Sequence, residues 1–132
     1  MATTVAVLGA GSWGTALAVH LGRLGHDVRL WARDRSFADE MASRRANAVY
    51  LPDVIFPDSV SVTAAIDRAV DGVALVICAV PSHGARAVLR LADQERREPL
   101  EQRRALMILV VGVFAHRRAR RGRFAAGAGS AA

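Results

Sequence analysis

The sequence Gly9-Ala10-Gly11-Ser12-Trp13-Gly14 constrains the fold more than any other part of this chain. It follows residues 4–8, a short apolar run rich in β-branched residues, which predicts a strand buried on both faces. It opens a segment of helical periodicity that ends near Gly25, where a helix C-terminus favours positive φ. Between a strand and a helix, the G-x-G-x-x-G pattern predicts dinucleotide binding. The alternative, an ordinary glycine-rich turn without a ligand, is disfavoured by this context.

Each glycine of the pattern has a mechanical role. Gly9 makes a tight turn, Gly11 lets the backbone approach a pyrophosphate, and Gly14 allows close packing of the helix on the strand. The pyrophosphate would lie on the N–H groups at the helix N-terminus, where the Ser12 hydroxyl can also reach a phosphate oxygen. The expected apolar face of this helix consists of Trp13, Ala16, Leu17, Leu21 and Leu24.

The rest of the chain alternates between strand and helix patterns. Strands are expected at 27–31, 60–63 and 73–80, helices from 34 or 36, at 64–70 and from 82, and an irregular connection at 47–59. This alternation predicts an α/β fold, a Rossmann-type doubly wound parallel sheet that is incomplete here. We expect 1–92 to form an NAD(P)-binding Rossmann domain and 93–115 to be a divergent segment with room for a fifth strand at 105–114. The Arg-, Ala- and Gly-rich residues 116–132 are expected to be disordered.

The charge pattern excludes several classes of function. All 18 basic residues are arginine, so no lysine-dependent acid–base step can be carried by this chain. Half of the arginines lie in residues 93–132, and no aromatic platform accompanies them, which favours a solvated charge run over a nucleic-acid site. The single cysteine, Cys78, excludes an internal disulfide and fits a reducing compartment. With no leader or membrane-spanning pattern, the sequence predicts a cytoplasmic protein without a membrane partner, and it suggests no metal site.

The end of the second strand decides which dinucleotide is preferred. An acidic side chain there binds the ribose 2′-OH of NAD, whereas an arginine accommodates the 2′-phosphate of NADP. Asp34 is a candidate for the first role but also an obvious N-cap of the next helix. Arg33 lies nearer the strand end, and we favour it over a solvated loop arginine as a cofactor contact. The pattern predicts that NADP is accepted at least as well as NAD.

Three further positions have both a structural and a functional interpretation. Trp13 is expected either to pack in the core or to place its indole beside the cofactor. Pro81 follows the 73–80 strand at its carboxyl end, where main-chain groups can line a cofactor channel. His83 is more simply a structural residue of a first helical turn than an acid–base group. Cys78 lies mid-strand and is expected to be an inert core residue.

Four motifs in the same order and at similar spacing resemble the bacterial NAD(P)-dependent glycerol-3-phosphate dehydrogenases. They are residues 5–18, residues 28–34, Asn47…Tyr50-Leu51-Pro52, and Ala79-Val80-Pro81-Ser82-His83. The resemblance covers residues 4–91 and implies that Ser12, Trp13, Arg33 and Tyr50 contact the cofactor. It also implies reduction of dihydroxyacetone phosphate to sn-glycerol 3-phosphate for phospholipid synthesis.

The chain departs from the family's pattern after residue 92. The family has a Thr-Lys-Gly-type turn after its fifth strand and a second, helical domain with the catalytic lysine; this sequence matches neither. We therefore expect no catalytic residues in this chain, cofactor binding without turnover, and a truncated or frame-shifted origin of residues 93–132. Two alternatives are another dehydrogenase of a 2-oxo compound or sugar acid with the same front half, and a non-catalytic dinucleotide-binding module.

Overall fold

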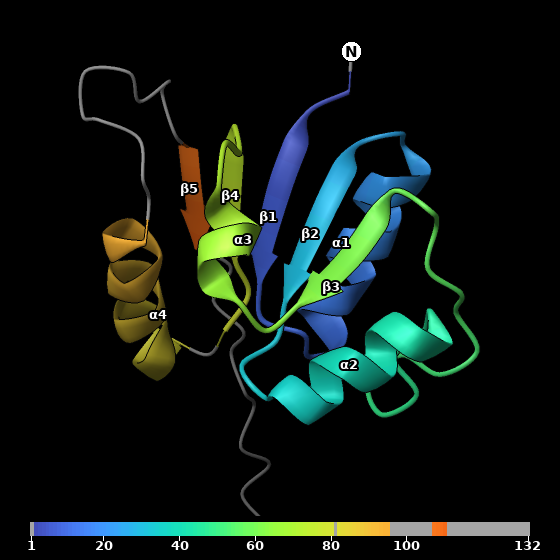
Figure 1. The fold of residues 1–132 in the computed structure, drawn as a ribbon. Helices are drawn as coiled ribbons and strands as arrows, with labels where there is room; N and C mark the ends of the chain where they lie inside the picture. Colours follow the sequence, from blue (N-terminus) through green and yellow to red (C-terminus); the bar gives the residue numbers. More distant parts are fainter. Residues whose placement is uncertain (1, 81, 96–106, 111–132) are drawn as a thin grey trace, which may run out of the picture.

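A computed structural model describes residues 2–80, 82–95 and 107–110 of the chain. Strands and helices alternate along these residues (Figure 1). The elements are β1 (Thr4–Leu8), α1 (Ser12–Arg23), β2 (Asp27–Trp31), α2 (Arg35–Arg44), β3 (Val60–Thr63), α3 (Ile66–Val70), β4 (Leu75–Cys78), α4 (Ser82–Gln94) and β5 (Met107–Val110). All paired strands are parallel, in the order β3-β2-β1-β4-β5. The predicted Rossmann-type sheet is confirmed.

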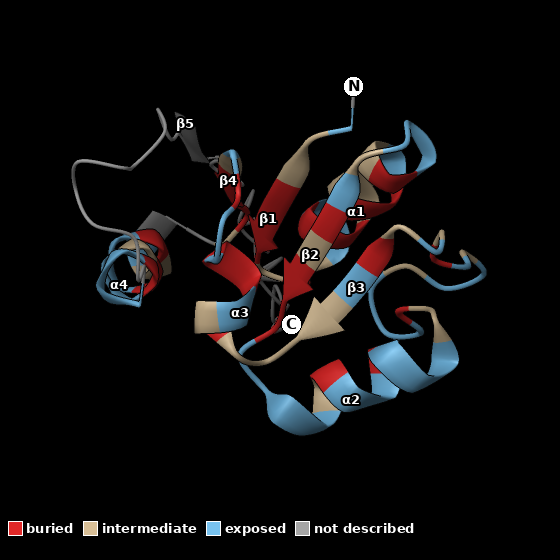
Figure 2. Ribbon diagram, turned by 45° about the horizontal axis from the view of Figure 1, so that its top comes forward, coloured by how far each residue is buried: buried red, intermediate tan, exposed pale blue. Residues whose placement is uncertain are grey.

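Two hydrophobic clusters lie on opposite faces of the sheet. Alternation along β1 places Val5 and Val7 in the cluster covered by α1 and α2, and Ala6 and Leu8 in the cluster covered by α3 and α4. Both sets are apolar and buried, and Figure 2 shows the burial along most of β1. The chain therefore leaves β1 toward one face and β4 toward the other. This divergence opens a crevice at the carboxyl ends of the two strands.

Helix α1 packs on the sheet through small residues, and the face predicted for it is wrong. Its buried residues are Gly14, Thr15, Ala18, Val19 and Gly22. Trp13 is 54% exposed and Leu24 is 62% exposed, while Leu17 and Leu21 reach the core only in part. A Cβ on Gly22 would lie 2.6 Å from Val60 Cγ2, so larger side chains on this face would push the helix away from the sheet. Close approach, and not hydrophobicity, selects the buried face.

Other elements differ from the prediction at their ends. Strand β4 is shorter than the strand expected at 73–80. Helix α4 continues to Gln94, past the expected domain boundary at residue 92. Ala85, Val88 and Ala92 form the buried side of α4. Strand β5 lies within 105–114 and pairs with β4. The expected tail at 116–132 lies outside the described residues. None of the described helices has the length and apolarity needed to cross a bilayer.

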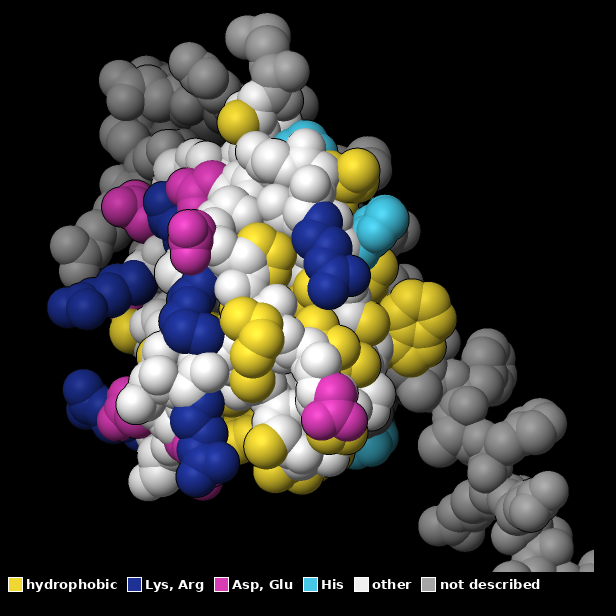
Figure 3. Space-filling model, turned by 90° about the vertical axis from the view of Figure 1, so that its right-hand side faces the viewer, with side chains coloured by type: hydrophobic (Ala, Val, Ile, Leu, Met, Phe, Trp, Pro, Cys, Tyr) yellow, Lys and Arg dark blue, Asp and Glu magenta, His cyan; other side chains and the backbone are white. Residues whose placement is uncertain are grey.

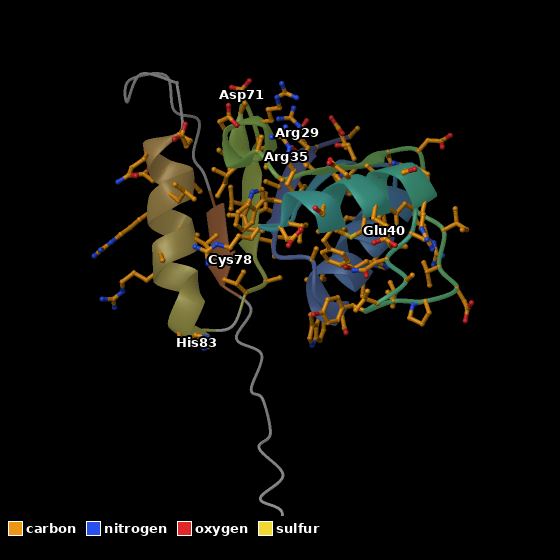
Figure 4. All side chains as sticks on the ribbon, turned by 60° about the horizontal axis from the view of Figure 1, so that its bottom comes forward. Arg29, Arg35, Glu40, Asp71, Cys78 and His83 are labelled. Carbon is orange, nitrogen blue, oxygen red and sulfur yellow. The ribbon has the colours of Figure 1, made fainter. Side chains whose placement is uncertain are left out.

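One charged side chain takes part in the packing of α3 on the sheet. Arg29 on β2 donates from Nη1 to the carbonyl oxygens of Arg68, at 2.9 Å, and Asp71, at 2.6 Å. These carbonyls belong to the C-terminal end of α3 and the turn after it, and Figure 4 shows Arg29 beside Asp71. A helix C-terminus carries partial negative charge, so the guanidinium stabilises the position of α3 on the sheet.

We expect Gly14→Ala to destabilise the fold by about 1–3 kcal/mol, because its Cβ would overlap the Gly9 carbonyl oxygen. Gly84→Ala is the matched control, since a Cβ on Gly84 meets no atom within 4 Å. Substituting alanine inside a helix there should stabilise the fold by about 0.5–1 kcal/mol. Urea unfolding of both variants measures the difference. Equal stabilities would contradict close packing at Gly14.

Candidate functional site

A cavity of about 530 Å³ lies at the carboxyl ends of the central strands. Its walls come from the turn after β1, the turn after β2, the segment after β4 and the connection after α2. The lining residues include Gly9, Ala10, Gly11, Ala32, Arg33, Asp34, Phe37, Tyr50, Ala79, Val80, His83 and Gly84. This is the crevice at which the chain leaves β1 and β4 toward opposite faces, the position where open α/β sheets bind ligands.

The glycine-rich turn enters this cavity without a side chain to fill it. Gly9 has φ of 115°, a conformation that favours glycine, and its N–H donates to the Trp31 carbonyl at 3.0 Å. Gly11 is the N-cap residue of α1, and no side chain caps this helix in the structure. The first turn of α1 contains no acidic residue. A helix N-terminus without a carboxylate, beside an open cavity, is suited to an anion.

Asn47 connects the glycine-rich turn to the connection after α2. Its side chain is fully buried, and Nδ2 donates to the Ala10 carbonyl at 3.0 Å and to Thr15 Oγ1 at 2.9 Å. Its Oδ1 accepts from the Tyr50 N–H at 3.0 Å. Sequence reasoning used Asn47 only as part of a motif and missed this function, because the bonds span 32 and 37 residues. A polar residue at the start of an irregular segment that contains two prolines was the available signal.

Asp34 and Arg33 adopt different roles after β2. Asp34 is the N-cap of α2, and its Oδ1 accepts from the Phe37 N–H at 2.9 Å. This confirms the capping interpretation, and Asp34 also lines the cavity. Arg33 is exposed and borders both this cavity and a neighbouring polar one lined by Arg35, Thr63 and Arg68, among others.

An aromatic pair, Phe37 and Tyr50, forms another part of the cavity wall. Phe37 and Tyr50 meet edge to face, with ring centroids 6.0 Å apart and an angle of 76°. Tyr50 is 50% exposed although it lines the cavity. Figure 3 shows hydrophobic side chains reaching the surface between arginines on the side of the molecule that carries α2. The ring of Tyr50 therefore offers an accessible apolar surface to a ligand.

The structure gathers only some of the predicted cofactor residues at the cavity. Gly9, Gly11, Arg33 and Tyr50 line it, whereas Ser12, Trp13 and Gly14 belong to the adjoining first turn of α1. Pro81 lies outside the described residues. His83, for which a structural role was favoured, is exposed and lines the cavity at the start of α4 (Figure 4).

Cys78 is an inert core residue, as predicted. It is fully buried in β4, and burial raises the pKa of its thiol, while a backbone hydrogen bond involving Val80 acts in the opposite direction. A thiol with a raised pKa stays protonated and is a poor nucleophile. The described residues contain no group of three His, Cys, Asp or Glu side chains placed to hold a metal ion.

Comparison with known proteins assigns this arrangement to a family. Residues 4–123 match the family model described as the N-terminus of NAD-dependent glycerol-3-phosphate dehydrogenase. The chain belongs to this family. The family is one of oxidoreductases, and the resemblance deduced from the four sequence motifs is confirmed, although the match continues past the expected residues 4–91 to residue 123.

Individual relatives match about two thirds of the chain. The glycerol-3-phosphate dehydrogenase [NAD(P)+] of Thermoanaerobacter sp. is 49% identical over 84 residues, covering 64% of this chain and 25% of the relative. That of Halorhodospira halophila is 50% identical over 93 residues, covering 70% and 28%. The crystal structure of the Coxiella burnetii enzyme superposes with a TM-score of 0.73 at 31% identity, over 85% of this chain and 33% of that one. The chain thus spans about a quarter of the curated relatives' length.

We expect Asp34→Ala to destabilise the fold by about 1 kcal/mol, because the Phe37 N–H loses its acceptor. Asp34→Asn is the matched control, since an asparagine oxygen caps a helix about as well as a carboxylate. Thermal or urea unfolding of the two variants separates capping from charge. If both variants lose the same stability, the charge and not the cap is responsible.

Proposed function

We propose that this chain binds NAD or NADP in the cavity at the ends of β1, β2 and β4. The observation that carries the proposal is the uncapped N-terminus of α1, which follows the glycine-rich turn and adjoins this cavity. Such an N-terminus supplies N–H donors and a favourable dipole for a pyrophosphate. The family and the NAD(P)+ in the relatives' names agree with this chemistry.

The lining residues divide between the parts of a dinucleotide. Gly9, Gly11, Ser12 and Gly14 would provide backbone and hydroxyl contacts to the pyrophosphate. Arg33 would contact the adenosine ribose and a 2′-phosphate. The rings of Tyr50 and Trp13 would offer apolar contact, and the backbone near Pro81 would line the channel for the rest of the cofactor. The cofactor itself supplies hydride chemistry, and these residues only bind and orient it.

In the whole enzyme, the proposed reaction is reduction of dihydroxyacetone phosphate to sn-glycerol 3-phosphate for phospholipid synthesis. A proton donor and cationic groups for the substrate phosphate are needed beside the nicotinamide. Among the described lining residues, His83 and Arg33 are the basic side chains; His83 belongs to α4, and Arg33 lies between β2 and α2. A cytoplasmic location and the absence of nucleic-acid and membrane partners stay predictions from the sequence.

Calorimetric titration of the chain with NADH and NADPH tests the proposal directly. We expect binding of both, with no oxidation of either when dihydroxyacetone phosphate is added, because the sequence contains no lysine to match the family's catalytic one. Heat of binding absent for both cofactors, from a folded sample, would refute the proposed function. Turnover above a blank without substrate would show that the chemistry needs no such lysine.

We expect Gly11→Val to abolish cofactor binding while the chain remains folded. A Cβ on Gly11 meets no protein atom within 4 Å, so the fold tolerates it, yet the branched side chain occupies the space through which a pyrophosphate approaches. Ala74→Val is the matched control, because Ala74 is exposed before β4, away from the cavity. Affinity like that of the unmodified chain in a folded Gly11→Val variant would contradict the assignment of the turn.

We expect Arg33→Ala to weaken NADPH binding by about 1.5–3 kcal/mol, the usual contribution of a hydrogen bond to a charged group. NADH binding should change much less, because NADH has no 2′-phosphate. Arg35→Ala serves as the control, since Arg35 is also exposed but lines only the neighbouring cavity. Equal weakening of both cofactors by Arg33→Ala would instead indicate stacking on adenine.

A further inference from the structure

Asn47 is a buried polar side chain that hydrogen-bonds to two segments of the cavity wall, at Ala10 and at Tyr50. Its Nδ2 donates to the Ala10 carbonyl in the glycine-rich turn and to Thr15 in the first turns of α1. Its Oδ1 accepts from the Tyr50 N–H, and its own carbonyl accepts from the Leu51 N–H at 2.9 Å. Asn47 itself does not line the cavity. It therefore contacts the lining residues from the protein interior.

The direction of one peptide group follows from this contact. No described peptide bond is cis, so the carbonyl of Ala10 and the N–H of Gly11, which share a peptide plane, point in opposite directions. The carbonyl is fixed toward the buried Asn47 side chain. The N–H is thereby turned away from Asn47, and within the described residues it donates to no protein group. Gly11 is one of the residues that line the cavity.

We infer that Asn47 is a positioning residue that aims the Gly11 N–H at the anionic group of the bound dinucleotide. The inference rests on the proposed function and adds a residue to it that never touches the cofactor. Glycine has no side chain to restrict its backbone, so the turn needs an external contact to keep one orientation. The Tyr50 N–H bonds to the same side chain, so Asn47 holds both the glycine-rich turn and the segment that carries Tyr50.

Two variants test the inference by calorimetric titration with NADPH. Asn47→Ala removes every side-chain bond, while Asn47→Asp keeps the acceptor for the Tyr50 N–H and replaces the donating NH2 group with a carboxylate oxygen. We expect each to bind NADPH about tenfold or more weakly, as for loss of an aligned hydrogen bond to a charged group. Ser59→Ala is the matched control. Ser59 Oγ donates to the Gly22 carbonyl at 2.8 Å, so this variant removes a long-range bond at the other end of α1 and should keep the affinity.

A spectroscopic measurement separates positioning from general stabilisation. In ¹⁵N-labelled unmodified chain, inorganic pyrophosphate should move the Gly11 amide proton signal downfield, and the shift should shrink in a folded Asn47 variant. If neither variant folds, the test rests on the Gly11 amide proton signal of the unmodified chain. A signal that pyrophosphate does not move overturns the inference. Folded variants that bind NADPH as the unmodified chain does overturn it as well, and leave the proposed function intact. If the unmodified chain binds neither cofactor, both fall together.

Discussion

No side chain fits between the end of β1 and the first turn of α1. A Cβ on Gly14 would overlap the Gly9 carbonyl oxygen, and one on Gly9 would lie 3.0 Å from Val80 Cγ1. This contact draws the start of α1 onto the carboxyl ends of β1 and β4, and the small residues Ala18 and Gly22 continue the close approach along the helix. The position of the N–H donors at the cavity is therefore a consequence of backbone packing.

The glycine-rich turn also needs contacts from outside the turn that select one backbone conformation. A segment of glycine and alanine has few side-chain contacts of its own to select one conformation. Asn47 supplies that selection through the Ala10 carbonyl and Thr15, and burial makes its bonds costly to break because water cannot replace them. The irregular connection after α2 is consequently part of the site, although it contributes Tyr50 alone to the cavity wall.

The sequence was sufficient for the sheet and for the glycine turn because both depend on local patterns. Continuous apolar strands and the spacing of Gly9, Gly11 and Gly14 determine the order and location of the elements. The face of α1 was mispredicted because periodicity weighs apolar bulk, whereas a helix this close to the sheet requires small residues there. The function of Asn47 was missed for a related reason: its partners lie 32 and 37 residues away, and nothing local indicates them.

The proposed choice between NAD and NADP depends on two adjacent side chains after β2, Arg33 and Asp34. One oxygen of Asp34 is committed to the Phe37 N–H, so the carboxylate is oriented by its own helix before any ligand arrives. Its second oxygen can still accept a hydrogen bond from a ribose hydroxyl, as NAD requires. Arg33 is exposed between two cavities and offers its guanidinium to a 2′-phosphate. In the proposed complex, Asp34 would serve NAD and Arg33 would serve NADP, in keeping with the NAD(P)+ in the relatives' names.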